Sequence, residues 1–326
     1  MLRLPPFTPH FPTTVEAALA LKAAHGAAAA YVAGGTDLYP NMKRRQQTPA
    51  HVIDLRGLAM LGELRVTAEG TLRIGAGVTL TRLIRSPLVR ERWPVVARAA
   101  ATVSTPILQN MGTVGGNLLL DTRCNYYDQS YEWRRAIDFC MKKDGAICWV
   151  APSSPRCWAV QSSDLAPVMV ALDARVELAG PEGGRTIPVR ELYRNDGIRH
   201  LGKAPDELLV AVEIPPLEGA RADYQKLRRR GSFDFPVLGV AAWARLEGEV
   251  VREARIVLGA VGSWPIASAE AAAALVGERL TEETIDAAAR AAARPAKPLD
   301  NTDFTIGWRK DMVPVFVRRA LEALRA

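Results

Sequence analysis

Alternating blocks of hydrophobic and polar residues predict an α+β chain. Near the N-terminus, Thr13 and Glu16 have the spacing of a capping box, and a helix is expected to follow them. An apolar run at 28–32 predicts a buried strand, and the segment 51–55 predicts the next strand. Together with a helix between these two strands, the pattern predicts a compact βαβ-like unit of about 55 residues.

The rest of the pattern divides at the double proline Pro215-Pro216. Before it, short strands are expected within 64–78 and again at 175–178 and 208–214. After it, the pattern predicts three strands at 224–227, 237–246 and 252–258, followed by helices at 267–276, 282–293 and 308–324. The predicted domains are therefore a first subdomain at 1–57, a second subdomain at 58–216 and a C-terminal α+β domain at 217–326.

Composition narrows the class of protein. The 326 residues are 48% apolar and 24% charged, which is typical of a globular protein and excludes disorder as the main state. No uncharged apolar stretch reaches the length of about 18 residues that a membrane span needs. Glu16 and Lys22 interrupt the first apolar segment, so no signal-peptide core is present. We therefore expect a cytoplasmic protein without a membrane partner.

The net charge of +7 raises the question of nucleic-acid binding. The densest cationic clusters lie at 43–45 and 228–230, and neither belongs to a recognisable DNA- or RNA-binding motif. We therefore predict no nucleic-acid partner, and a solvated basic surface that attracts acidic proteins.

Two glycine-rich loops of similar chemistry follow apolar segments, one at 33–37 and the other at 112–117. Paired glycines leave backbone N–H groups unobstructed, and such groups bind a diphosphate without a cation. Neither loop has the G-x-G-x-x-G fingerprint or a P-loop lysine. Either loop alone could be a plain tight turn. Together they suggest a diphosphate held between two subdomains.

The segments 33–38, 110–117 and 163–167 resemble, in this order, the FAD-binding loops of molybdenum hydroxylase flavoprotein subunits. These are the medium subunits of the carbon monoxide dehydrogenase and xanthine dehydrogenase type. The similarity continues through 206–209 and 224–229 and covers nearly the whole chain. It implies a two-subdomain FAD-binding domain (PCMH/vanillyl-alcohol-oxidase-like) and a C-terminal domain of the carbon monoxide dehydrogenase flavoprotein type. In that C-terminal domain, a three-stranded sheet precedes the helices.

The resemblance also implies roles for particular residues. The pyrophosphate would lie against the first loop and Thr113 to Gly116, and Asn117 would help to fix the second loop. Asp164 would accept hydrogen bonds from ribityl hydroxyls, Leu209 would pack on the adenine, and Lys226 would lie near the isoalloxazine. Simpler alternatives are a helix cap at Asp164 and a surface lysine at 226. The full set of implied FAD-binding residues is Ala33, Gly34, Gly35, Thr36, Asp37, Leu38, Thr113, Val114, Gly115, Gly116, Asn117, Asp164, Leu209 and Lys226.

All four cysteines of the chain fall in one window, at Cys124, Cys140, Cys148 and Cys157. Their spacing is C-x15-C-x7-C-x8-C. A structural zinc site usually has a C-x2–4-C pair, which is missing here. Disulfides are not expected in a cytoplasmic protein. An iron–sulfur cluster held by four thiolates is the favoured interpretation, with zinc or unligated core cysteines as the alternatives.

The cysteines lie in an insert of about 40 residues, at 121–160, between the second glycine loop and Asp164. An insert of this kind at this place resembles the β subunits of the 4-hydroxybenzoyl-CoA reductase branch of the family, where it binds a 4Fe–4S cluster. That resemblance implies reductive removal of the phenolic hydroxyl, with reduced ferredoxin as electron donor. It also implies a molybdopterin-binding large subunit, a 2Fe–2S small subunit and a dimer of heterotrimers.

No constellation of general bases is visible, so no catalytic residue is predicted in this chain. The four histidines, at positions 10, 25, 51 and 200, lie far apart in the sequence and are expected to be structural or exposed. The alternative function is a conventional molybdenum hydroxylase flavin subunit. Such a subunit would pass electrons to NAD or oxygen and would have a zinc-stabilised insert.

Overall fold

The computed structural model describes residues 2–325 and begins with a small parallel sheet of order β1-β3-β2. Its elements are β1 (Thr8–His10), α1 (Val15–His25), β2 (Ala29–Val32), α2 (Leu38–Lys43) and β3 (His51–Asp54). β2, α2 and β3 form the predicted βαβ unit, with β2 and β3 parallel. The predicted capping box is wrong, because the side chain that caps α1 belongs to Thr14, which accepts from the amide of Ala17.

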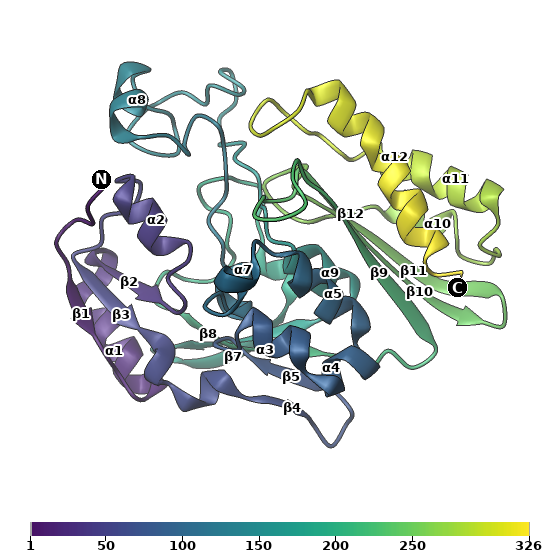
Figure 1. Cartoon of the computed structure of the whole chain (residues 1–326), viewed down its shortest axis with the longest axis horizontal. Helices are drawn as coiled ribbons and strands as arrows, with labels where there is room; N and C mark the ends of the chain where they lie inside the picture. The colour runs from purple at the N-terminus through teal and green to yellow at the C-terminus, as the bar shows by residue number, and fades with distance from the viewer. Residues whose placement is uncertain (1, 326) are drawn as a thin grey trace.

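A five-stranded sheet of order β4-β5-β8-β6-β7 lies between the first sheet and the C-terminal sheet in Figure 1, and all its pairs are antiparallel. Short helices lie beside it. Pro87 and Pro94 each occupy the first position of a helix, where the backbone N–H that proline lacks would have no partner within the helix. The strands are β4 (Leu64–Val66), β5 (Leu72–Gly75), β6 (Arg175–Gly180), β7 (Gly183–Pro188) and β8 (Leu208–Ile214). The helices are α3 (Leu80–Arg85), α4 (Pro87–Arg92), α5 (Pro94–Thr102), α6 (Pro106–Gln109), α7 (Val114–Leu118) and α9 (Leu165–Ala171).

The C-terminal region is an antiparallel sheet followed by helices. Its strands are β9 (Ala220–Leu227), β10 (Leu238–Glu247), β11 (Val250–Gly259) and β12 (Ile266–Ala267), in the order β12-β11-β10-β9. Its helices are α10 (Ala269–Ala273), α11 (Glu282–Ala292) and α12 (Ile306–Glu322). Three strands were predicted, and the two-residue β12 is the addition. This region confirms the expected sheet-then-helix layout.

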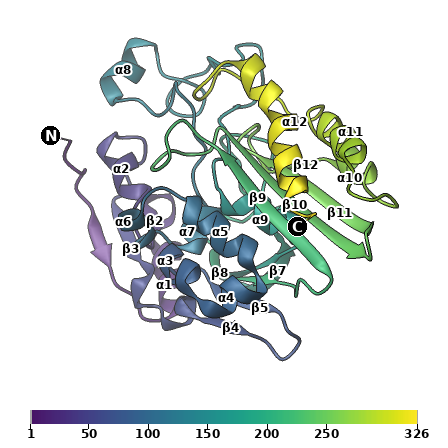
Figure 2. The same ribbon diagram turned by 45° about the vertical axis from the view of Figure 1, so that its right-hand side comes forward.

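The C-terminal sheet is buried on both faces. Figure 2 shows α10, α11 and α12 over one face, where Leu238, Ile256 and Val317 belong to one apolar cluster. On the other face, Trp243 and Val257 join the large core cluster of the central region. Because the two regions share this core, they present fixed surfaces to the space between them.

The cysteine insert stands away from the central sheet and carries the short helix α8 (Tyr131–Ala136), beside α2 in Figure 1. Arg134 is buried and donates to the carbonyl oxygens of Arg44 and Arg45, just after α2. On its other side, the insert is hydrogen-bonded to the C-terminal region, where the Asn301 side chain donates to the carbonyl oxygen of Trp158 at 2.6 Å. The insert therefore bridges the first sheet and the C-terminal region. Within residues 2–325, no helix has the length and apolar character that a membrane crossing requires.

Candidate cofactor site

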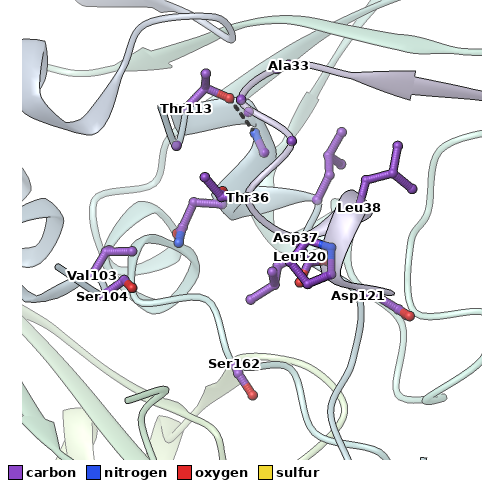
Figure 3. Close-up of a pocket in the computed structure, with 18 of the residues that line it drawn as sticks. Ala33, Thr36, Asp37, Leu38, Val103, Ser104, Thr113, Leu120, Asp121 and Ser162 are labelled. Atoms are coloured by element: carbon purple, nitrogen blue, oxygen red, sulfur yellow. Dashed lines mark hydrogen bonds between the residues drawn. The ribbon is translucent and has the colours of Figure 1, made fainter. Parts of the chain in front are cut away.

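A cavity of about 640 Å³ lies where the first sheet, the central five-stranded sheet with its helices, and the C-terminal region meet. Its volume is within the usual range for a pocket that holds a large organic ligand. Figure 3 shows the first glycine loop, from Ala33 to Leu38, crossing the cavity, with Thr113 beside Ala33 and Ser162 on the far side. The C-terminal region contributes residues at 233–235 and 301–303. Of the predicted FAD-binding residues, all but Val114 and Lys226 line this cavity.

The two glycine loops pack directly against each other. A Cβ added at Gly34 would lie 1.8 Å from the carbonyl oxygen of Met111, which precedes the second loop. Gly35 has φ +69°, and a Cβ there would lie 2.4 Å from the ring of Tyr39. Only glycine fits at both positions, because one needs close backbone approach and the other a left-handed conformation. The loops therefore form one continuous cradle.

The two loops differ in the backbone donors that they offer. Among the described residues, no acceptor receives the amides of Gly34, Gly35 and Thr36. In the second loop, by contrast, the amide of Gly115 donates to Ala76 at 2.8 Å, and that of Gly116 donates to the Thr113 hydroxyl at 3.1 Å. The first loop thus has the free N–H groups that an anionic diphosphate requires. The second loop lines the cavity and packs closely against the first loop, but its glycine amides already have acceptors.

Asp164 and Lys226 form a buried ion pair at the edge of the cavity. The Lys226 Nζ lies 2.9 Å from an Asp164 oxygen, and each side chain is 3% exposed. The Tyr224 hydroxyl donates to the other Asp164 oxygen at 2.8 Å. Burial lowers the pKa of Lys226 and opposes the effect of the Asp164 carboxylate. The alternative of a surface lysine at 226 is therefore wrong.

The alternative of a helix cap at Asp164 is also wrong, because its side chain makes no capping bond to α9. Asn117 has that role, since its Oδ1 accepts from the amide of Leu165 at 3.2 Å and from the Ser163 hydroxyl at 2.7 Å. Asn117 thereby ties the second glycine loop to α9. Asp164 lines the cavity and Lys226 lies behind it, so the carboxylate is the member of the pair that faces a ligand.

We expect Lys226→Met to lower the free energy of unfolding by about 3 kcal/mol, because it leaves the Asp164 carboxylate buried without its cation. Urea denaturation of the flavin-free chain measures this loss. The matched control is Arg229→Met, which removes an exposed ion pair with Asp303 at 3.5 Å and should cost less than about 1 kcal/mol. Equal, small losses in both variants would contradict the buried pair.

The four cysteines converge on a second, small cavity, although they come from separate parts of the insert. All four are free thiols and are between 5% and 7% exposed. Cys124 lines both this cavity and the large one. Cys124 therefore borders both the glycine cradle and the cysteine site.

The surroundings of the sulfur atoms fit a metal centre. Burial raises the pKa of Cys124 to about 12 and that of Cys157 to about 11. In both cases the neighbouring cysteines make a smaller contribution in the same direction. A metal ion binds the thiolate form of cysteine and replaces the thiol proton. The amide of Ala159 donates to the Cys157 Sγ at 3.4 Å, a bond that favours the thiolate.

The chain around Cys140 contains several residues in the left-handed conformation. Asp138, Phe139 and Asp144 have φ values of 61°, 57° and 69°, which non-glycine residues seldom adopt. A Cβ added at Gly145 would lie 2.7 Å from the amide nitrogen of Cys140. Such strained turns persist where the surroundings fix them, and they cluster at ligand sites.

Arg123 lines the large cavity, and from the sequence it is expected only as one of the cations beside the cysteines that offset the negative charge of a cluster. Its guanidinium pairs with Asp37 of the first glycine loop and lies 3.2 Å from Asp128 of the insert. It also stacks on Phe235 of the C-terminal region, 4.4 Å from the ring centroid. Burial raises the pKa of Asp37, and Arg123 opposes that rise. Its position directly before Cys124 was the available clue in the sequence.

Two family models together match almost the whole chain. Residues 5–217 match the FAD binding domain in molybdopterin dehydrogenase, and residues 222–324 match the CO dehydrogenase flavoprotein C-terminal domain. The chain belongs to this family. It is an FAD-binding subunit of the molybdenum hydroxylase family, and therefore part of an oxidoreductase.

Curated and solved relatives agree with this assignment. The aldehyde oxidoreductase FAD-binding subunit PaoB of Escherichia coli is 38% identical over 79% of this chain and 83% of its own. The carbon monoxide dehydrogenase medium chain of Afipia carboxidovorans is 30% identical over 98% of this chain and 97% of its own. The structure of carbon monoxide dehydrogenase from Hydrogenophaga pseudoflava superposes with a TM-score of 0.82 at 28% identity, covering 99% of this chain and 98% of that one. The molybdenum hydroxylase flavoprotein fold expected from the sequence is thus confirmed.

Proposed function

We propose that this flavoprotein subunit carries a 4Fe–4S cluster beside its FAD and transfers electrons within a molybdenum enzyme. The observation that carries the proposal is the double position of Cys124, which lines both the large cavity and the four-cysteine cavity. A subunit that only binds flavin has no need of four buried thiols that meet beside its flavin cavity. The free amides of the first glycine loop support placement of the FAD diphosphate there.

In this proposal, the chain positions both groups and excludes water from them. Cys124, Cys140, Cys148 and Cys157 would hold the cluster, and Lys142 would offset part of its negative charge. Lys142 is fixed for that task, because its ammonium group donates to Asp121 and Thr122, each at 2.8 Å. Asp164 would accept hydrogen bonds from flavin hydroxyls, and Leu209 would contact the adenine. When bound, the flavin supplies one- and two-electron chemistry and the cluster supplies one-electron chemistry.

The proposed partners are a molybdopterin-binding large subunit, a 2Fe–2S small subunit and ferredoxin as electron donor, in a dimer of heterotrimers. Support comes from the relatives, which are medium chains and FAD-binding subunits. The net charge of +7 favours an acidic electron donor. On the insert, Tyr131 and Trp133 are both 40% exposed and offer contact area beside the cysteine site.

The proposed overall reaction is reduction of 4-hydroxybenzoyl-CoA to benzoyl-CoA, supported by the similarity of the cysteine insert to that branch of the family. Aldehyde oxidation is the second candidate, because PaoB, at 38% identity, is a subunit of an aldehyde oxidoreductase. Assays of the purified complex separate the two. Turnover of 4-hydroxybenzoyl-CoA with reduced ferredoxin supports the first, whereas turnover of aldehydes with an electron acceptor supports the second and rejects the first.

Metal and sulfide analysis of the anaerobically purified complex tests the cofactor content. Because the partner subunits also contain iron, the chain is separated under native conditions before the measurement. We expect about four iron and four sulfide per chain, with one FAD. Zinc without sulfide would overturn the cluster and favour a conventional flavin subunit that has a zinc-stabilised insert. Absence of flavin from the folded chain would overturn the cradle.

A further inference from the structure

Three of the four histidines meet at the outer corner of the first sheet, although they lie far apart in the sequence, where each was expected to be structural or exposed. His10 ends β1, His25 ends α1 and His51 begins β3. The parallel pairing of β1 with β3 places Thr8 opposite His51 and brings His10 close to it. One ring nitrogen from each histidine lies within 4.8 Å of the other two. None of the three lines the flavin cavity or the cysteine cavity.

The rings are in direct contact. His10 Nε2 lies 3.0 Å from His51 Nδ1, which requires that one of these nitrogens carry a proton and the other a lone pair. His25 stacks on His51 with ring centroids 3.7 Å apart and an interplanar angle of 14°. Burial and the two neighbouring imidazoles lower the pKa of His51. The neutral imidazole is the form of histidine that binds metal ions.

We propose that His10, His25 and His51 form a binding site for a late first-row divalent cation such as Zn²⁺ or Ni²⁺. Imidazole nitrogen is the preferred ligand of these ions, and three histidines leave a fourth position for water or an exogenous ligand. Tetrahedral zinc with Zn–N bonds of about 2.0–2.1 Å needs nitrogen atoms roughly 3.3–3.4 Å apart. The three ring nitrogens lie within 4.8 Å of one another, so side-chain rotation has to bring them at most about 1.5 Å closer to reach that geometry.

The position of the cluster also favours a cation. His25 is the last residue of the 11-residue helix α1, where the helix dipole presents its negative end. The Lys22 ammonium lies at the same helix end, where it donates to the carbonyl oxygens of Gly26, the C-cap of α1, and of Ala29 at 2.8 Å and 2.6 Å. A bound ion would cross-link β1, α1 and β3. It would thereby stabilise the unit from which the first glycine loop extends.

Isothermal titration of the purified complex with Zn²⁺, and separately with Ni²⁺, tests the site. We expect one ion per chain in addition to any taken up elsewhere, and His25→Gln and His51→Gln should each weaken that binding at least about tenfold. His200→Gln is the matched control, because the fourth histidine lies outside the cluster and should leave binding unchanged. Uptake at the cysteines is common to all these variants, so the differences between them report only the histidines.

A second readout keeps the result interpretable. Zn²⁺ should raise the Tm of the wild type and of His200→Gln, but not that of His25→Gln. The FAD content of each variant shows whether it is folded, and His10→Gln replaces any variant that has lost its flavin. Zn²⁺ and Ni²⁺ affinities that are the same in wild type and folded cluster variants would overturn the proposal. Metal binding at the histidines does not depend on the iron–sulfur cluster, which the iron and sulfide content tests separately.

Discussion

Cys140→Ser is expected to reduce the iron content of the isolated chain from about four to less than one atom, while FAD stays bound. The serine hydroxyl is a poor ligand for iron, and the three remaining thiols cannot complete four-cysteine ligation. Cys140 is the suitable position because it lines only the small cavity, whereas Cys124 also borders the flavin cavity. Iron analysis and the visible spectrum measure the change, since the broad absorbance beneath the flavin bands should disappear.

The matched control is Met141→Leu, because Met141 lines the same small cavity and the substitution conserves its volume. This variant should keep its iron. If Cys140→Ser retained the iron content of the wild type, four-cysteine ligation would be refuted. Loss of iron from both variants would mean that the cavity tolerates no change, and Cys148→Ser compared with Ile147→Leu would then decide.

The second large effect is expected from Gly34→Ala, which should lower the affinity for FAD about 100-fold. The added Cβ would lie 1.8 Å from the carbonyl oxygen of Met111, so the two glycine loops must separate. A loss of about 3 kcal/mol in binding free energy suffices for a change of this size. Flavin released from the purified variant by denaturation, and titration with FAD, measure it.

Gly231→Ala is the control for this variant, because a Cβ at Gly231 meets nothing within 4 Å. It should bind FAD as the wild type does. Retained iron in Gly34→Ala would show that the chain is folded, and normal FAD occupancy in that variant would reject the cradle. The second loop gives a different expectation. A Cβ at Gly115 would lie 2.7 Å from the Cβ of Ala76, so larger residues there disturb packing inside the protein before they meet a ligand.

The sequence predicted those parts of the fold that short-range patterns determine. β2 and β3 were visible as apolar runs with a glycine loop between them. β1 was missed because three residues, one of them Pro9, carry no alternation, and only pairing with β3 makes them a strand. β12 was missed for the same reason, since two residues cannot form a pattern.

The site was predictable where composition concentrated unusual residues. Four cysteines in one window pointed to a common site, and the structure brings all four to one cavity. The contact between Arg123 and Asp37 joins residues far apart in the chain, and no local signal specifies it. The histidine cluster was invisible for the same reason, because the register of β1 against β3 creates it.

The large cavity, which we propose holds the flavin, is lined by residues of the first sheet, the central region and the C-terminal region. A ligand that binds this arrangement, and not the unfolded chain, stabilises all three regions by mass action. The cofactor-free polypeptide should therefore be more readily cleaved by proteases at the segments around 104, 233 and 302 that border the cavity. In a cell short of riboflavin, degradation would then remove the empty subunit before it could compete for its partners.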